Sequence, residues 1–183
     1  MKTILIGLVL LLGGCESLES PNPASPYFAF NSGWVVRLNQ PLTIPADAAT
    51  VRLQYGAIVP RNSVQEHDAY CVVELNTVSP NPQTLKPGQF KVWRVTRSVE
   101  TLAAIPSFFV KAGYALDDSG PSFLYYKTEF HLRDPAQPNL RSMTCAWDQM
   151  APSNRSLMRH LTLNEMRRAL GNWITLIPPG ETL

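Results

Sequence analysis

Few residues of this chain combine types and spacing that could do chemistry. Glu66, His67 and Asp68 are adjacent and could offer three neighbouring ligands to a metal ion. Neighbouring residues of a strand point to opposite faces, so only a turn would bring these three side chains together. We favour a polar surface loop between two strands here, and we expect no metal site.

A polar stripe formed by Lys127, Glu129 and His131 is a second candidate. These residues alternate with apolar ones, so they share one face of a predicted strand. A histidine beside a carboxylate can act as a general acid or base near neutral pH. The solvent-exposed face of an antiparallel sheet is polar whether or not it has a function, and we prefer to interpret these residues as such a face. His131 is retained as a candidate ligand-binding residue.

The tryptophans are Trp34, Trp93, Trp147 and Trp173. Aromatic side chains fill cores efficiently, so we expect two or three of them to be buried. Trp147 is followed by Asp148, and such a pair could line a pocket for a sugar or a peptide. We favour a core position for the indole, and we retain Trp147 and Asp148 as candidate ligand-binding residues.

The motifs of common enzyme classes are missing from the sequence. It has no nucleophile elbow, no phosphate-binding glycine loop, no dinucleotide fingerprint and no zinc-protease motif. The 16 Lys and Arg residues against 14 Asp and Glu give a net charge of +2 without a basic run, which argues against nucleic-acid binding. We therefore expect a protein that is not an enzyme and uses no cofactor.

The pattern of apolar residues predicts the elements that position these side chains. The chain has 183 residues, which suits one domain, and its 16 prolines leave little room for long helices. Alternation predicts strands over residues 34–38, 51–55, 71–75, 123–133 and 143–147, and a last strand over 173–177. In the second of these, Val51, Leu53 and Tyr55 share a face. Residues 107–116 and a turn at 117–121 are interpreted as a hairpin leading into 123–133.

One short helix is predicted near the C-terminus. Thr162 and Glu165 have the spacing of a capping box, and Gly171 is placed to end the helix. The predicted fold class is mainly β, an antiparallel β-sandwich or barrel with one short C-terminal α-helix.

The first residues have the pattern of an export signal. Lys2 supplies a positive charge, and residues 4–12 are apolar except for Gly7. A membrane-spanning helix needs about 20 apolar residues, so this shorter stretch is interpreted as a signal peptide.

The segment Leu12-Gly13-Gly14-Cys15 that follows resembles the lipobox of bacterial lipoproteins. The resemblance implies cleavage before Cys15 and acylation of its thiol and new amine. Glu16 stands where an aspartate would favour retention in the inner membrane, so the resemblance implies the outer membrane. The alternative is an ordinary signal peptide with a cysteine near its cleavage site.

These patterns divide the chain into three parts. Residues 1–14 are a lipoprotein signal peptide, residues 15–26 are the lipidated cysteine and a proline-rich flexible tether, and residues 27–183 form a single β-rich periplasmic domain.

Of the three cysteines, Cys15 is the predicted lipidation site, which leaves Cys71 and Cys145. Both lie on the apolar face of a predicted strand, and an even pair in an oxidising periplasm predicts a disulfide. The alternative is two separate buried thiols. A catalytic thiol fits less well, because neither cysteine lies in a Cys-x-x-Cys motif or beside an activating base.

Residues 34–177 resemble small uncharacterised envelope lipoproteins of Gram-negative bacteria, chiefly in residues 37–45, the strand around Cys71 and residues 161–171. The resemblance implies no activity and no catalytic residue. We expect a non-enzymatic binding or accessory module on the periplasmic face of the outer membrane. Its partners would be the membrane, through the lipid, and an envelope protein or cell-wall component.

Two alternatives stay open for the function. One is a periplasmic inhibitor or assembly accessory protein, which an exposed sheet edge would favour. The other is a hydrolase, which would need His131 or His67 to converge with a carboxylate or a metal in a cleft.

Overall fold

The computed structural model describes residues 20–28, 30, 32–102, 122–151 and 154–181. This part of the chain is an antiparallel β domain with one short α-helix, which confirms the predicted fold class. The predicted signal peptide, the predicted lipidation site Cys15 and the predicted hairpin at 107–121 lie outside the described residues.

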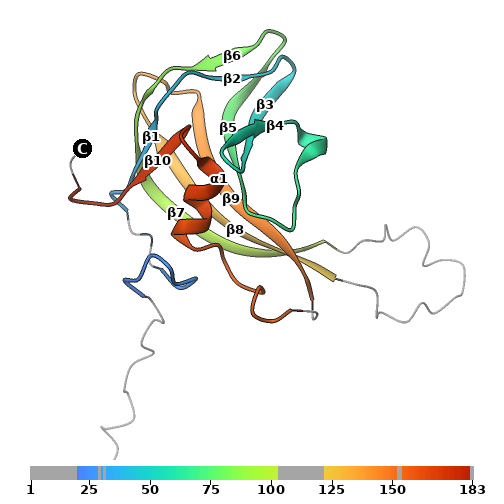
Figure 1. Cartoon of the computed structure of the whole chain (residues 1–183). Coiled ribbons are helices and arrows are strands. Elements are labelled where there is room, and N and C mark those ends of the chain that lie inside the picture. The colour runs from blue at the N-terminus through green and yellow to red at the C-terminus, as the bar shows by residue number, and fades with distance from the viewer. Residues whose placement is uncertain (1–19, 29, 31, 103–121, 152–153, 182–183) are drawn as a thin grey trace, which may run out of the picture.

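The main sheet has eight strands in the order β10-β1-β7-β8-β9-β5-β3-β4, and it curls into a half-barrel (Figure 1). Its strands are β1 (Val35–Leu38), β3 (Ala48–Gln54), β4 (Ala57–Val59), β5 (Tyr70–Ser79), β7 (Gly88–Leu102), β8 (Ser122–Arg133), β9 (Leu140–Ala151) and β10 (Ile174–Ile177). A separate two-stranded ribbon pairs β2 (Leu42–Ile44) with β6 (Gln83–Leu85). A 3-10 turn, η1 (Arg61–Ser63), follows β4.

The burial of alternate residues along β8 confirms the two faces that the sequence predicts for this strand. Phe130 and Leu132 are buried inside the half-barrel, whereas Glu129 and His131 lie on the outer face. β8 is flanked by β7 on one side and β9 on the other. Pairing with both strands fixes the positions of the β8 side chains on the outer face of the sheet.

The expectation that Tyr55 shares the buried face of Val51 and Leu53 is wrong. β3 ends at Gln54, which is itself buried, and Tyr55 is 65% exposed. Tyr55 and Gly56 have φ values of 54° and 76°, and two positive φ values in a two-residue hairpin loop identify a type I′ turn. This turn reverses the chain into β4 one residue earlier than the alternation predicts.

The longest strand, β7, has no counterpart among the predicted strands. Val92 pairs with Leu132 and Arg94 pairs with His131, so Trp93 is an extra residue in a β-bulge. Before the bulge the even-numbered residues, such as Phe90 and Val92, face inward. After the bulge the odd-numbered residues face inward instead. The interrupted alternation explains why the strand has no clear period of two.

The helix α1 (Leu163–Leu170) closes the opening of the half-barrel. Thr162 and Glu165 form the predicted capping box, and the buried face includes Met166 and Leu170. The helix contacts β10 at one edge of the sheet and β3 and β5 near the other edge (Figure 1). At its C-terminal end, the Gly56 amide donates to the Ala169 carbonyl over 3.0 Å, which ties the β3–β4 turn to the helix.

The interior of the half-barrel is filled by side chains. The unoccupied space among the core residues around Phe90, Leu132 and Met143 is about 10 Å³, no more than a single water molecule needs. None of the helices in the described part of the chain is long and apolar enough to cross a membrane.

Candidate functional site

Trp147 and Asp148, the adjacent pair that the sequence singles out, lie on β9 opposite Tyr126 and Tyr125 of β8. Successive side chains of a strand point to opposite faces, so these two side chains contact different parts of the protein. Trp147 faces α1, and Asp148 faces the turn that carries His67. The pair therefore does not line one common pocket.

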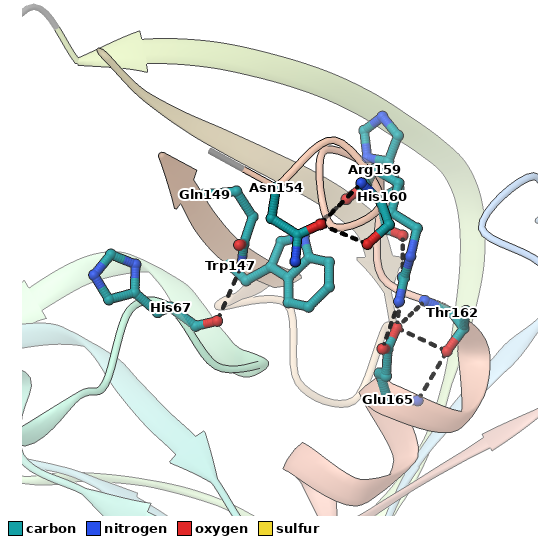
Figure 2. A network of polar contacts seen from close by, with 9 residues as sticks. His67, Trp147, Gln149, Asn154, Arg159, His160, Thr162 and Glu165 are labelled. Carbon is teal, nitrogen blue, oxygen red and sulfur yellow. Dashed lines mark hydrogen bonds and ion pairs between the residues drawn. The ribbon is translucent and has the colours of Figure 1, made fainter. Parts of the chain in front are cut away.

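Trp147 is buried, with 6% of its surface exposed. Its indole N–H donates to the carbonyl of Arg159 over 2.7 Å, and the Arg159 guanidinium lies 4.8 Å from the centre of its ring (Figure 2). The polar atom of the indole is thus already paired, as expected of a buried tryptophan.

Arg159 also makes a two-pronged ion pair with Glu165, with both N–O distances at 2.9 Å (Figure 2). Glu165 accepts further hydrogen bonds from the amide and the hydroxyl of Thr162, each over 2.8 Å. Burial alone would raise the pKa of the Glu165 carboxyl, but these donors outweigh it and lower the pKa to about 2. The network fixes the segment before α1, and α1 itself, against Trp147.

A hollow of about 410 Å³ lies beside this network, between α1, the β3–β4 turn and the segment before β5. It is lined by Tyr55, Asp68, Ala69, Trp147, Glu165, Arg168 and Ala169. The Tyr55 hydroxyl donates to Asp68 over 2.6 Å. Glu165 is already hydrogen-bonded to Arg159 and Thr162. The other polar side chains that line this hollow, and could contact a ligand, are those of Tyr55, Asp68 and Arg168.

His67 and Asp148 form a close pair on the other side of β9. Nδ1 of His67 lies 2.5 Å from Oδ1 of Asp148, and the two side chains are 67% and 6% exposed. Burial raises the pKa of the Asp148 carboxyl, and the contact with His67 works in the opposite direction. Because Nδ1 faces Asp148, Nε2 is the ring nitrogen of His67 that is left to meet a ligand or substrate.

The run Glu66-His67-Asp68 lies in a turn, yet its three side chains diverge. Glu66 accepts from the Tyr125 hydroxyl over 2.6 Å, His67 contacts Asp148, and Asp68 accepts from Tyr55. Within the described ranges, no three His, Cys, Asp or Glu side chains group as metal ligands would.

His131 lies far from Trp147 and Asp148. It pairs with Ser142, five residues before Trp147 on β9, which is roughly 17 Å along a strand at about 3.4 Å per residue. Nε2 of His131 is 3.1 Å from the Thr96 hydroxyl, and Nδ1 is 3.6 Å from Glu129. Its ring also lies 5.5 Å from that of Trp93, a contact made through the β-bulge that sequence reasoning missed.

The predicted pairing of Cys71 with Cys145 is confirmed. The residues are directly opposite on β5 and β9, and their sulfurs are bonded at 2.05 Å. Both are fully buried, so the bond lies inside the core and not on a surface that could act in thiol exchange.

Fold and contacts together define a disulfide-bonded, half-barrel β domain closed by one helix, with its hollows on the outside. No protein-family model matches the chain, and the comparisons with curated proteins and with solved structures give no match either.

Proposed function

We propose that this protein is a non-enzymatic binding module of the bacterial cell envelope, anchored by a lipid on Cys15 to the periplasmic face of the outer membrane. The domain would bind an envelope protein or a cell-wall component through its outer surface. The lipid would hold this surface near the membrane, since two or more acyl chains anchor a protein stably.

The observation that carries this proposal is the buried bond between Cys71 and Cys145. Disulfides of this structural kind form and persist in oxidising compartments, and the periplasm is one. The export signal and the segment Leu12-Gly13-Gly14-Cys15 agree with that compartment.

The filled interior supports an external binding surface. Small barrels that carry a ligand inside leave a cavity for it, whereas the unoccupied space among the core residues around Phe90, Leu132 and Met143 is about 10 Å³. The larger hollows, such as that beside Trp147, open on the outside of the domain.

Crosslinking in living cells, followed by capture of the protein, tests the proposal. The control is a Cys15→Ala variant behind an ordinary cleavable signal peptide, which is exported but carries no lipid. We expect one stoichiometric envelope partner, or cell-wall fragments, with the wild-type protein and a strong reduction with the control. Recovery of neither material from both proteins would contradict the proposal, as would equal recovery from both.

One observation favours a second candidate function, a hydrolase. The exposed ring of His67 against the buried carboxylate of Asp148 is an arrangement in which histidine acts as a general base. Nε2 would take a proton from water while the water oxygen bonds to the carbonyl carbon of an ester. The proton would then pass to the leaving alkoxide.

The two candidates are separated by an activity assay with purified protein on p-nitrophenyl acetate and on peptidoglycan. A hydrolase predicts turnover that is lost in His67→Gln and kept in Asn62→Ala, a change at an exposed position of the same loop. Turnover that is absent, or unchanged by His67→Gln, would remove this candidate.

A further inference from the structure

Trp93 is placed on the outer face of the sheet by the bulge in β7. It is the extra residue between Val92 and Arg94, and 48% of its surface is exposed. Trp34 and Trp147, in contrast, are buried in the core. Bulges often redirect a side chain beside a functional site, and a large exposed indole is a strong binding group.

Two side chains of β8 hold the Trp93 ring in place. The guanidinium of Arg133 lies 5.2 Å from the centre of the ring, and the imidazole of His131 lies 5.5 Å away at 49°. Arginine prefers the face of an indole, so this contact orients the ring while part of it stays open to solvent.

The same region of β7 and β8 concentrates positive charge. Lys91 is directly opposite Arg133, and Arg94 is directly opposite His131. Lys91 and Arg133 are like charges at opposite positions of two strands, which destabilises a sheet. Across the described part of the chain, no carboxylate lies at ion-pair distance from Lys91, Arg94 or Arg133. A bound anion would relieve this repulsion.

A hollow of about 530 Å³ adjoins the exposed indole. Its walls include Trp93, His131 and Arg133 from the strands, and Pro135 and Asn76 from the turn between β8 and β9 and from β5. The one carboxylate among its lining residues, Asp134, accepts a hydrogen bond from the Ala136 amide over 3.0 Å. The hollow thus offers an aromatic face, polar side chains and the guanidinium of Arg133, while Arg141, which also lines it, is paired with Glu74.

We propose that this hollow binds an acidic saccharide, a sugar that carries a carboxylate or a phosphate. The apolar face of the sugar ring stacks on Trp93, and its anionic group lies at Arg133. Lys91, directly opposite Arg133, and Arg94, next to Trp93, add positive charge beside the hollow. Saccharides combine flat apolar faces with many hydroxyls, which matches a partly exposed indole beside polar side chains. This inference rests on the proposed binding function and names its ligand class, but it does not depend on the lipid.

Calorimetric titration of the mature lipidated protein in detergent tests the inference. The probes are trigalacturonate, the neutral galactotriose and inorganic phosphate. We expect trigalacturonate to bind at least about tenfold more tightly than galactotriose or phosphate. Trp93→Ala should weaken trigalacturonate by about tenfold or more, and Arg133→Gln should weaken trigalacturonate by a larger factor than galactotriose.

Arg155→Gln is the matched control, because Arg155 is exposed but lies in the segment before α1. It should leave every affinity unchanged, and thermal unfolding should show that all variants are folded. Absence of trigalacturonate binding would overturn the inference, as would equal affinity for phosphate or equal effects of Arg133→Gln and Arg155→Gln. If crosslinking still captures an envelope partner, such a result removes the saccharide and leaves the binding function in place.

Discussion

Cys71 and Cys145 occupy directly opposite positions on β5 and β9, with their Cα atoms 4.0 Å apart and both side chains fully buried. The bond joins residues 74 positions apart in the sequence. It therefore connects the strand that leads to the β3–β4 edge of the sheet with the strand that carries Trp147.

We predict that the Cys71→Ala/Cys145→Ala protein has a free energy of unfolding lower than the wild type by roughly 2–5 kcal/mol, because a long loop is no longer closed in the unfolded chain. Urea unfolding followed by tryptophan fluorescence measures the difference. Dithiothreitol should lower the stability of the wild type toward that of the variant and leave the variant unchanged. A loss below about 1 kcal/mol would contradict a structural role for the bond.

Gly171 is predicted to tolerate no side chain. It ends α1 with a φ of 55°, and a Cβ atom there would lie 2.4 Å from the Cα of Gly56. Both backbone strain and overlap with the β3–β4 turn should lower the melting temperature of Gly171→Ala.

Gly180→Ala is the control for this prediction. Gly180 also has a positive φ, 83°, but a Cβ atom there would meet nothing within 4 Å. This variant should show the smaller loss, of about 1–2 kcal/mol from backbone strain alone. Equal losses in the two variants would show that the contact between the turn and the helix is unimportant.

The Glu165 carboxyl should make the fold sensitive to acid. Its pKa falls from 4.5 to about 2 because hydrogen bonds from Arg159 and Thr162 outweigh the effect of burial. The unfolded state binds more protons between these two values, so this contribution is fully present above pH 4.5 and is lost as the pH falls toward 2. We predict that Glu165→Gln is less stable than the wild type at pH 7 and that the gap closes in this window. Urea unfolding at several pH values measures the difference in the free energy of unfolding between the two proteins. A difference independent of pH would contradict the network.

His160 should add a second acid-sensitive step at higher pH. Burial, and then the positive charge of Arg97, lower its pKa from 6.5 to about 4. The native state favours the neutral ring, so its contribution is lost as the pH falls from 6.5 toward 4. The stability of the wild type relative to His160→Gln should decline over this range. An NMR titration that places the His160 pKa near 6.5 would contradict the prediction.

The sequence predicts much of this fold because local signals agree with it. The capping box of Thr162 and Glu165, the alternation in β8 and the pairing of Cys71 with Cys145 all depend on residue types in fixed patterns. The features that were missed interrupt those patterns. The bulge at Trp93 changes the parity of β7, and the type I′ turn at Tyr55 ends β3 early.

The candidate sites are harder to predict because they depend on contacts between distant segments. The sequence singles out Trp147 and His131 by type, but the partners of Trp147 arrive from the segment before α1. The contact of His67 with Asp148 and that of His131 with Trp93 join residues from different strands and turns. Only the order and register of the strands bring these side chains together.

Intact-mass analysis of the protein extracted from the outer-membrane fraction of its host tests the proposed lipid anchor and the disulfide together. We predict a mature chain that begins at Cys15, carries acyl groups on the thiol and the amine of Cys15, and has Cys71 and Cys145 oxidised to a disulfide. A chain that keeps residues 1–14, lacks the acyl groups, or contains free thiols at Cys71 and Cys145 would contradict a lipid-anchored module of the cell envelope.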